Sequence, residues 1–216
     1  IDRANRVLAV IDEIPAKPGE ETDLKTQYKG ELLAVRAYCH FELIRNFASG
    51  YEADSMGVPY MEVSEISTPE PLTFSATMAK INADLTAAKA LIPASFDDNT
   101  RITRLAISAI QARVALYEKN WDNAITYATE AIDGMPLVAR ANFPKMWHDE
   151  ADGEVIWKLK RVTSDEETPL GDVYTQASYL DNPAGWRVYY AASHELTNLF
   201  DKTNDIRFST YIVIDP

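Results

Sequence analysis

Residues 104–136 read RLAISAIQARVALYEKNWDNAITYATEAIDGMP, and this stretch indicates the fold more clearly than any other part of the chain. In its first half, alanines recur every three positions over residues 109–115, a spacing that lets another helix approach closely. The second half begins after Asn120, a natural N-cap, and traces one apolar helix face until Gly134 and Pro136 end it. That face consists of Trp121, Ala124, Ile125, Ala128, Ala131 and Ile132. The stretch therefore predicts two packed helices.

Small residues and a proline of this pair stand at the spacing of a tetratricopeptide repeat, which is a helix–turn–helix unit. They are Ala112, Ala124, Ala131 and Pro136. One such unit cannot bury its own apolar face, so it needs stacked neighbours. The helices before it are the candidates, because Ala88 and Pro93 echo the end of the pair. We therefore expect a mainly α fold in which tetratricopeptide-like helical pairs stack into an α-α superhelix.

Apolar residues at helical spacing predict three earlier helices, over residues 1–14, 24–47 and 75–92. Pro15 stops the first, and Ser75 is the expected N-cap of the third. The second carries two apolar stripes, which indicates two packed neighbours. One stripe holds Leu33, Ala37, Phe41 and Ile44, and the other holds Leu32, Cys39 and Leu43.

Two polar residues, Arg36 and His40, lie between these stripes. Arg36 is interpreted as a structural anchor for a hydrogen bond or an ion pair, not as a ligand contact. Cys39 is the only cysteine, so the chain forms no internal disulfide, and its apolar neighbours predict an inert buried thiol.

The pattern changes after about Leu137, which divides the chain into a helical scaffold over residues 1–136 and a second segment over residues 137–216. In that second segment, residues 155–160 alternate like a short strand, and residues 194–200 predict a short helix. Residues 163–192 between them are irregular. We expect this loop-rich part to pack on the scaffold.

Composition excludes several classes of partner. The net charge of −12 repels nucleic-acid backbones and anionic lipid headgroups, so we expect neither as a partner. No apolar run approaches the roughly 20 residues that a membrane span needs.

Catalytic signatures are weak. The three histidines are scattered, and no glycine-rich phosphate loop or Gly-x-Ser-x-Gly motif occurs. The acidic runs at residues 149–152 and 165–167 lack the spacing of a calcium loop, so solvated charge is the favoured interpretation and calcium the alternative. Glycoside hydrolysis by a pair of carboxylates stays an open alternative, because the separation of two carboxylates depends on the fold. We expect no enzyme, no cofactor and no metal site.

Sugar binding is the chemistry that the second segment favours. Flat aromatic rings stack on the C–H faces of a sugar, while amides and carboxylates bind its hydroxyl groups. The candidate ligand-binding residues are Tyr174, Tyr179, Asn182, Trp186, Tyr189 and Tyr190. The alternative is that these aromatic residues pin the loop to the helical body. Trp121 and Trp157 lie on apolar faces of regular elements and are predicted to belong to the core.

Several segments resemble the SusD/RagB family. Residues 29–47, KGELLAVRAYCHFELIRNF, are similar to its hallmark helix, with a Gly-Glu start, an Arg-Ala centre and an aromatic end. Residues 57–59, Gly-Val-Pro, are similar to the short turn that follows that helix in the family. Further resemblances follow in the family's order. They are Ala4-Asn5-Arg6, the helices that end at Pro136, residues 143–159, and residues 193–207 with their Asp-x-Arg end.

The resemblance implies a non-catalytic lipoprotein of the Bacteroidetes cell surface, located at the outer membrane. Such a protein binds an oligosaccharide, or another nutrient, and delivers it to a SusC-like TonB-dependent transporter. Family members are usually longer and carry an N-terminal lipid anchor, so we expect this chain to be part of a longer protein. The alternative is a helical-repeat module that binds a protein partner and no small ligand.

Overall fold

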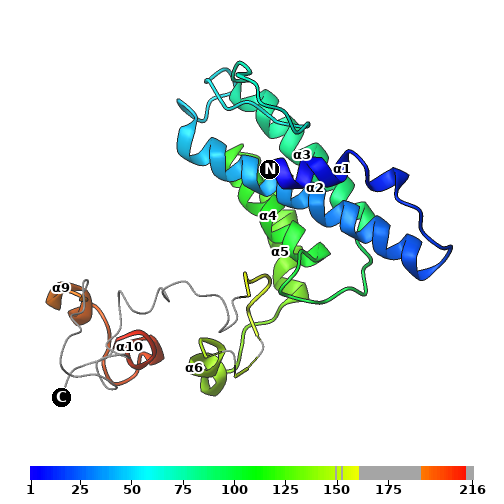
Figure 1. The fold of residues 1–216 in the computed structure, drawn as a ribbon. Coiled ribbons are helices and arrows are strands. Elements are labelled where there is room, and N and C mark those ends of the chain that lie inside the picture. Colours follow the sequence, from blue (N-terminus) through cyan, green and yellow to red (C-terminus); the bar gives the residue numbers. More distant parts are fainter. Residues whose placement is uncertain (149, 152, 161–190, 213–216) are drawn as a thin grey trace, which may run out of the picture. The chain divides into compact units, whose positions relative to one another are not determined.

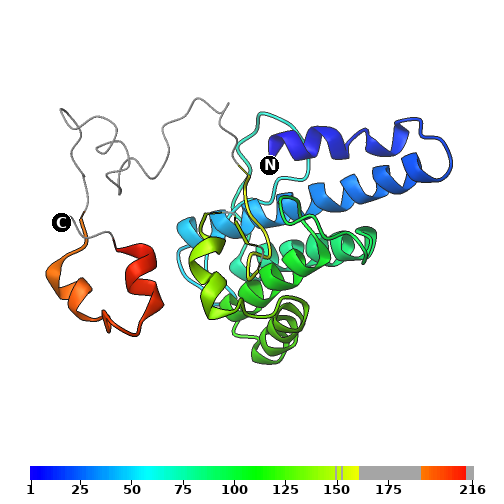
Figure 2. The ribbon, with the colours of Figure 1, turned by 90° about the horizontal axis from the view of Figure 1, so that it is seen from below.

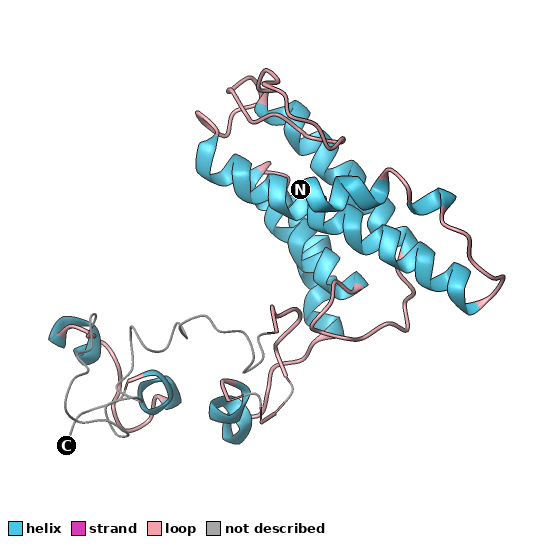
Figure 3. Ribbon diagram, viewed as in Figure 1, coloured by secondary structure: helices cyan, strands magenta, loops and turns pink. Residues whose placement is uncertain are grey.

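A computed structural model describes four ranges of the 216-residue chain, namely residues 1–148, 150–151, 153–160 and 191–212. The chain divides into two compact units. The helical unit comprises Ile1–Pro136 with Glu154–Leu159, and the C-terminal unit comprises Leu137–Gly153 with Lys160–Pro216. Within the four described ranges the regular structure is helical, apart from one isolated bridge between Met56 and Thr73 (Figure 3). The mainly α fold predicted from the sequence is confirmed.

The helical unit is a stack of helices in which α2 packs along α3 and α4 packs along α5 (Figures 1 and 2). Its elements are α1 (Asp2–Leu8), the 3₁₀ turn η1 (Ile11–Glu13), α2 (Glu20–Phe47), α3 (Phe74–Leu91), α4 (Arg104–Tyr117) and α5 (Trp121–Gly134). The C-terminal unit contains η2 (Arg140–Asn142), α6 (Phe143–Met146), α9 (His194–Asn198) and α10 (Ile206–Tyr211). The predicted tetratricopeptide-like helical pairs are therefore present.

Side-chain caps fix where three of the long helices begin. Thr103 Oγ1 accepts the backbone N–H of Ala106 at 3.1 Å, and Asn120 caps α5 as predicted. The N-cap of α3 is Thr73, which accepts the N–H of Ala76 at 3.2 Å, so the expectation of a cap at Ser75 was wrong by two positions. Thr73 has the extended backbone that an N-cap needs, whereas Ser75 already lies inside the first turn.

The first predicted helix is shorter than its apolar pattern suggested. Helix α1 ends at Leu8, and the chain re-forms only the short turn η1 before Pro15. This break brings the side chain of Ile11 into the protein, where it is buried, while Val10 stays exposed. The second helix begins earlier than predicted, at Glu20, because an acidic first turn interacts favourably with the helix dipole.

The core lies where α2, α3 and α4 meet. From α2 it takes Ala37, Phe41 and Ile44, three members of the stripe that the sequence predicted, while the fourth member, Leu33, is half-buried and packs against the core. The other helices contribute Met78, Ile81, Leu85, Ile107 and Val114. Gly30 lets α2 approach α3 closely, since a Cβ there would lie 3.1 Å from the backbone oxygen of Ala88. Cys39 is half-buried, less enclosed than the predicted buried thiol.

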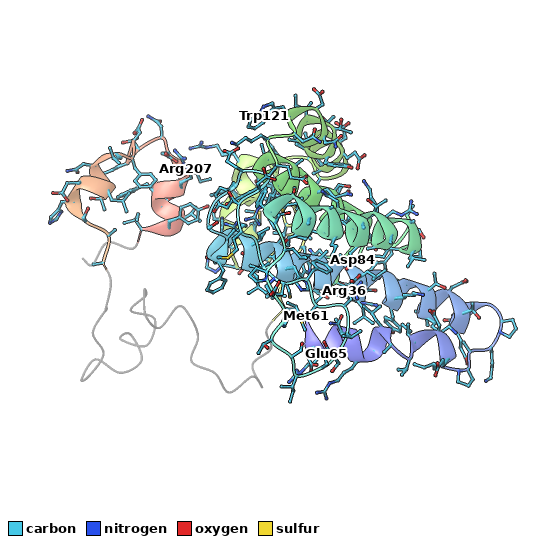
Figure 4. The ribbon with its side chains drawn as sticks, turned by 90° about the horizontal axis from the view of Figure 1, so that it is seen from above. Arg36, Met61, Glu65, Asp84, Trp121 and Arg207 are labelled. Atoms are coloured by element: carbon cyan, nitrogen blue, oxygen red, sulfur yellow. The ribbon has the colours of Figure 1, made fainter. Side chains whose placement is uncertain are left out.

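A buried ion pair joins α2 to α3 (Figure 4). Arg36 donates through Nε and Nη2 to the two carboxylate oxygens of Asp84, at 2.6 and 2.8 Å. Tyr60 Oη donates to the same carboxylate at 2.6 Å. The hydrogen bond with Asp84 raises the pKa of Arg36, and burial raises the pKa of Tyr60. The interpretation of Arg36 as a structural anchor is confirmed.

Polar side chains of α1 and α2 also hold the connection between α2 and α3. Asn5 Nδ2 donates to the carbonyl of Met61 at 2.9 Å, and the N–H of Met61 donates to His40 Nε2 at 2.9 Å. His40 Nδ1 donates to the carbonyl of Arg36 at 2.8 Å, so both ring nitrogens are used by the neutral imidazole. Burial accordingly lowers the pKa of His40. These hydrogen bonds satisfy the backbone N–H and C=O groups of Met61, which in a sheet a neighbouring strand would satisfy.

Helix α5 uses only one side of its apolar face for packing on α4. Ala124 and Ala131 are buried, whereas Trp121, Ile125 and Ile132 are 59%, 66% and 68% exposed. The prediction that Trp121 belongs to the core was therefore wrong. The reason is positional: the two alanines face α4, and Trp121 lies on the outer side of the helix (Figure 4).

Residues 155–160 carry no regular secondary structure, in contrast to the predicted short strand. The N–H of Lys158 donates to the carbonyl of Asn99 at 2.8 Å, and within the described ranges no strand lies beside the segment to form a ladder. Ile156 and Trp157 pack against the core, where Trp157 meets Tyr38 edge-on with ring centroids 5.2 Å apart. The prediction that Trp157 contributes to the core is confirmed.

Candidate functional site

The six residues predicted to bind a ligand lie outside the residues that the structure describes. They are Tyr174, Tyr179, Asn182, Trp186, Tyr189 and Tyr190. Their role as sugar contacts stays a prediction.

An aromatic cluster occurs in the C-terminal unit, where Phe143, Trp147 and Tyr211 meet. The Trp147 and Tyr211 ring centroids are 5.1 Å apart, and the two rings stand at 84° to each other. Phe143 meets Tyr211 at 5.9 Å and Trp147 at 6.4 Å. Trp147 is 58% exposed and Tyr211 is 45% exposed, so two large rings stand nearly perpendicular at the surface. We call these three residues the aromatic corner.

Two short helices position the aromatic corner. Helix α6 starts with Phe143 and has a proline in its first turn, which suits a helix start because proline fixes φ and needs no N–H partner there. Phe143 and Trp147 stand four positions apart, the spacing that places two side chains on the same side of a helix. Tyr211 is the last residue of α10, whose N-cap Asp205 accepts the N–H of Arg207 at 2.9 Å.

Charged hydrogen-bonding groups lie on the same helix as Tyr211. Arg207, labelled in Figure 4, stands four positions before Tyr211. It donates from Nε and Nη2 to the two carboxylate oxygens of Asp205, at 2.9 and 2.6 Å. The guanidinium lowers the pKa of Asp205 to about 2. Within the described residues Nη1 of Arg207 makes no hydrogen bond, and the Arg207 side chain is 61% exposed. The Asp-x-Arg sequence is thus a helix cap that also presents a guanidinium.

This arrangement suits binding. Exposed rings can stack on the C–H face of a pyranose, and a guanidinium held by a carboxylate can bind sugar hydroxyl groups. Three or more His, Cys, Asp or Glu side chains gathered to hold a metal ion are not found among the described residues. Nor does any described helix have the length and apolar character needed to cross a membrane.

A cavity of about 440 Å³ lies in the helical unit, between the end of α3, the start of α4 and the end of α5. Three of its four charged lining residues, Lys89, Arg104 and Glu130, already bind one another, a neighbouring side chain or the backbone. Glu130 accepts from Lys89 and, at 2.8 Å, from Ser108 Oγ, and Arg104 Nε donates to the carbonyl of Ile92 at 2.6 Å. The hydrogen bond from Lys89, and to a smaller extent the one from Ser108, lowers the pKa of Glu130. The cavity is therefore better explained as a structural junction of three helices than as the ligand site.

Sequence reasoning did not select Phe143, Trp147 or Tyr211 as ligand contacts. One signal was present, because Phe143 and Trp147 form an aromatic pair four positions apart. No local pattern links that pair to Tyr211, which folding alone brings to it.

The model of the SusD-like family, described as starch-binding and associating with the outer membrane, matches residues 1–116. A putative sugar binding protein from Bacteroides vulgatus is 28% identical, with a TM-score of 0.67 over 75% of this chain and 39% of that one. A SusD superfamily protein from Bacteroides thetaiotaomicron is 21% identical, with a TM-score of 0.78 over 95% of this chain and 47% of that one. A laminarin binding SusD-like protein is 20% identical, with a TM-score of 0.56 over 68% of this chain and 32% of that one.

The chain therefore spans less than half the length of each of these three structures. The two likenesses at about 20% identity concern the fold alone. No curated protein matches the sequence.

Proposed function

The chain belongs to the SusD-like family, and from that premise we propose that it is a non-catalytic glycan-binding protein of the outer-membrane surface. The aromatic corner is the observation that carries the proposal. It offers two exposed rings in a fixed mutual orientation, with the Asp205–Arg207 pair on the same short helix as one of the rings. Tyr174, Tyr179, Asn182, Trp186, Tyr189 and Tyr190 are proposed as further sugar contacts.

A matched pair of tryptophan variants tests glycan binding. Affinity electrophoresis and calorimetry against a polysaccharide panel that includes starch and laminarin identify the ligand first. Trp147→Ala should then weaken binding about fivefold, because one stacked aromatic contact contributes about 1 kcal/mol. Trp121→Ala is the control, because Trp121 is 59% exposed and Trp147 is 58% exposed. Equal affinities for the two variants would place the glycan elsewhere, and absence of binding to every glycan would refute the proposal.

Delivery to a SusC-like TonB-dependent transporter is the proposed role of the bound glycan. The family description, which associates these proteins with the outer membrane, supports it. Attachment to the membrane would be through an N-terminal lipid anchor of the longer protein. Immobilised chain incubated with detergent-solubilised outer membranes should recover a TonB-dependent barrel protein. Recovery of other proteins without such a barrel would count against delivery.

A helical-repeat interaction module without a small ligand is the second candidate function. The exposed residues Trp121, Ile125 and Ile132 on the outer face of α5 favour it, because apolar residues at helical spacing suit a protein partner. The two candidate functions predict different results for binding to the glycan panel. Saturable binding that depends on Trp147 supports the first candidate, and its absence together with a protein partner that depends on Ile125 supports the second.

A further inference from the structure

The aromatic corner joins two segments that are far apart in the sequence, and each segment contributes only a short helix. Helix α6 comprises four residues and α10 comprises six. Helices of this length are not stable by themselves in water, so contacts with the rest of the unit must set their direction. The orientation of Tyr211 against Trp147 therefore depends on what ties the two segments together.

Arg140 provides such a tie. It lies in η2, three positions before the start of α6, and its Nη2 donates to the carbonyl of Asn204. Asn204 directly precedes Asp205, the N-cap of α10. The ring contacts of Tyr211 lie at the other end of α10, roughly 9 Å further along the axis at 1.5 Å per residue. Two attachments at opposite ends of one short helix restrain its direction, whereas a single attachment would let it pivot.

The carbonyl of Asn204 is itself held in place by Asp201. Asp201 Oδ1 accepts the backbone N–H groups of Thr203 and Asn204, each at 3.0 Å, and its Oδ2 accepts from Asn204 Nδ2 at 2.9 Å. The N–H of Asp205 donates to the carbonyl of Asp201 at 2.8 Å. The side-chain hydrogen bond from Asn204 is the largest cause of a lowered pKa of Asp201. The turn therefore presents a fixed acceptor to Arg140.

Charge acts in the same direction as this hydrogen bond. The pKa of Asp205 is lowered to about 2, chiefly by its hydrogen bond with Arg207 and in smaller part by the charge of Arg140. Asp205 is therefore ionised at neutral pH, and its attraction for Arg140 draws the start of α10 toward η2. A substitution at position 140 that keeps the positive charge should keep part of this attraction.

We infer that Arg140 is a positioning residue of the aromatic corner, which holds the start of α10 and thereby sets the orientation of Tyr211 against Trp147 that glycan binding requires. Arg140 acts through Tyr211 and is not assigned a contact with the glycan. The inference rests on the proposed function, because the aromatic corner is the glycan site only under that proposal.

Fluorine NMR of the chain labelled with fluorotryptophan tests the positioning without any glycan. Each of the four tryptophans gives its own signal, and Trp147→Phe assigns the one of Trp147. Tyr211→Ala marks where that signal lies when the edge-on ring is absent. Arg140→Met, which removes the donor and the charge, should move the signal toward that position. The signals of Trp121 and Trp157, both in the helical unit, should stay unchanged.

Two further variants support this reading of the spectrum. Arg140→Lys keeps a positive charge and an N–H donor, so it should return the Trp147 signal most of the way to its position in the parent chain. Asp201→Ala disturbs the same tie from the other side, because it removes the turn that fixes the acceptor. It should move the Trp147 signal in the same direction as Arg140→Met. Circular dichroism and urea unfolding establish that each variant is folded.

Calorimetry then connects this position to binding. The glycan probes are soluble starch and laminarin, with any other polysaccharide of the panel that binds the parent chain. Arg140→Met should weaken binding about threefold, less than the loss of a ring, because both rings remain but are no longer held in one orientation. Arg140→Lys should recover most of the affinity. Arg3→Met is the matched control, because Arg3 is also exposed but lies in the helical unit, and it should bind as the parent does.

Three results would overturn the inference and leave the proposed function standing. They are a Trp147 signal that Arg140→Met leaves unchanged, movement of the Trp121 and Trp157 signals by as much as that of Trp147, and equal glycan affinities of Arg140→Met and the parent. Failure of the proposed function looks different. If Trp147→Ala binds every glycan probe as the parent does, the aromatic corner is not the glycan site, and the role of Arg140 in binding fails with it even where the signal moves.

Discussion

Where α2 meets α3, the interface encloses an ion pair; where α4 meets α5, the buried residues of α5 are alanines. Arg36 and Asp84 have side chains only 9% and 13% exposed. The ion pair between α3 and α5, Lys89 with Glu130, is 26% and 44% exposed. Burial in the first case requires that each charge be matched, since an unmatched charge away from water is strongly unfavourable. We therefore expect the buried ion pair to be much more sensitive to substitution than the exposed one.

The largest expected effect comes from Asp84→Ala, which leaves the Arg36 charge buried without its partner. We expect the free energy of unfolding to fall by about 3–5 kcal/mol. Urea unfolding followed by circular dichroism measures it. Glu130→Ala should lower stability by less than about 1 kcal/mol, because exposed pairs are screened by water. Equal losses for the two variants would contradict the distinction between the interfaces. The double variant Arg36→Met with Asp84→Leu should regain much of the loss, because no charge is then unmatched.

Gly30→Ala tests the close approach of α2 and α3. A Cβ at this position meets the backbone oxygen of Ala88 at 3.1 Å, and that oxygen cannot move without shifting α3. We expect a loss of about 1–3 kcal/mol from overpacking, although alanine by itself favours helix by about 1 kcal/mol. Thermal unfolding measures it.

Gly134→Ala is the control for this change. There the three atoms nearest to the new Cβ all belong to the side chain of Leu105, which can rotate away. A stabilising Gly30→Ala would show that the helices can separate without penalty.

A smaller, pH-dependent loss is expected from His40. Burial holds its pKa in the folded protein below the ordinary value of 6.5. The unfolded chain therefore takes up a proton first as the pH falls. The contribution of the neutral imidazole to stability is complete above pH 6.5 and declines as the pH falls from 6.5 toward the lowered value. Urea unfolding at several pH values between 7.5 and 5.5 measures this decline.

His40→Gln supplies the control for the pH series. Glutamine does not take up a proton in this pH range, so the free energy of unfolding of the variant should depend less on pH than that of the parent. A pH dependence of the free energy of unfolding that persists in this variant would assign the loss of stability to other groups.

The smallest effect is a gain. Lys119, in the turn between α4 and α5, has φ of 59°, a left-handed conformation that disfavours side chains with a Cβ. The ion pair of Lys119 with Glu52 is exposed and contributes little. Lys119→Gly should therefore raise stability by roughly 0.5–1 kcal/mol, measured by thermal unfolding. Lys119→Ala keeps the Cβ and loses the ion pair, so it should show no gain.

Sequence periodicity located the long helices because their patterns are local. The stripe with Ala37, Phe41 and Ile44 and the cap at Asn120 were both read correctly, since each depends on residues within a turn or two. Trp121 was misjudged for the opposite reason. Its helix has apolar residues over a broad arc, and only the position of α4 decides which part of that arc is covered.

The candidate site was less accessible from sequence. The sequence predicted sugar binding on aromatic residues of the second segment that lie outside the described part of the chain, so that site stays a prediction. The aromatic corner depends on Trp147 meeting Tyr211, and the two are far apart in sequence. Spacing rules cannot detect such a contact, because they describe residues on one helix or one strand.

The sequence by itself determined the long helices, the cap of α5 at Asn120 and the resemblance to the SusD-like family, because these follow from backbone preferences and side-chain spacing along short segments. The tertiary structure alone decided which apolar faces are covered, why Arg36 and His40 can be buried, and which aromatic rings meet at the surface. Burial and hydrogen-bond satisfaction depend on what lies opposite a residue in space, and that information is absent from any local stretch of the chain.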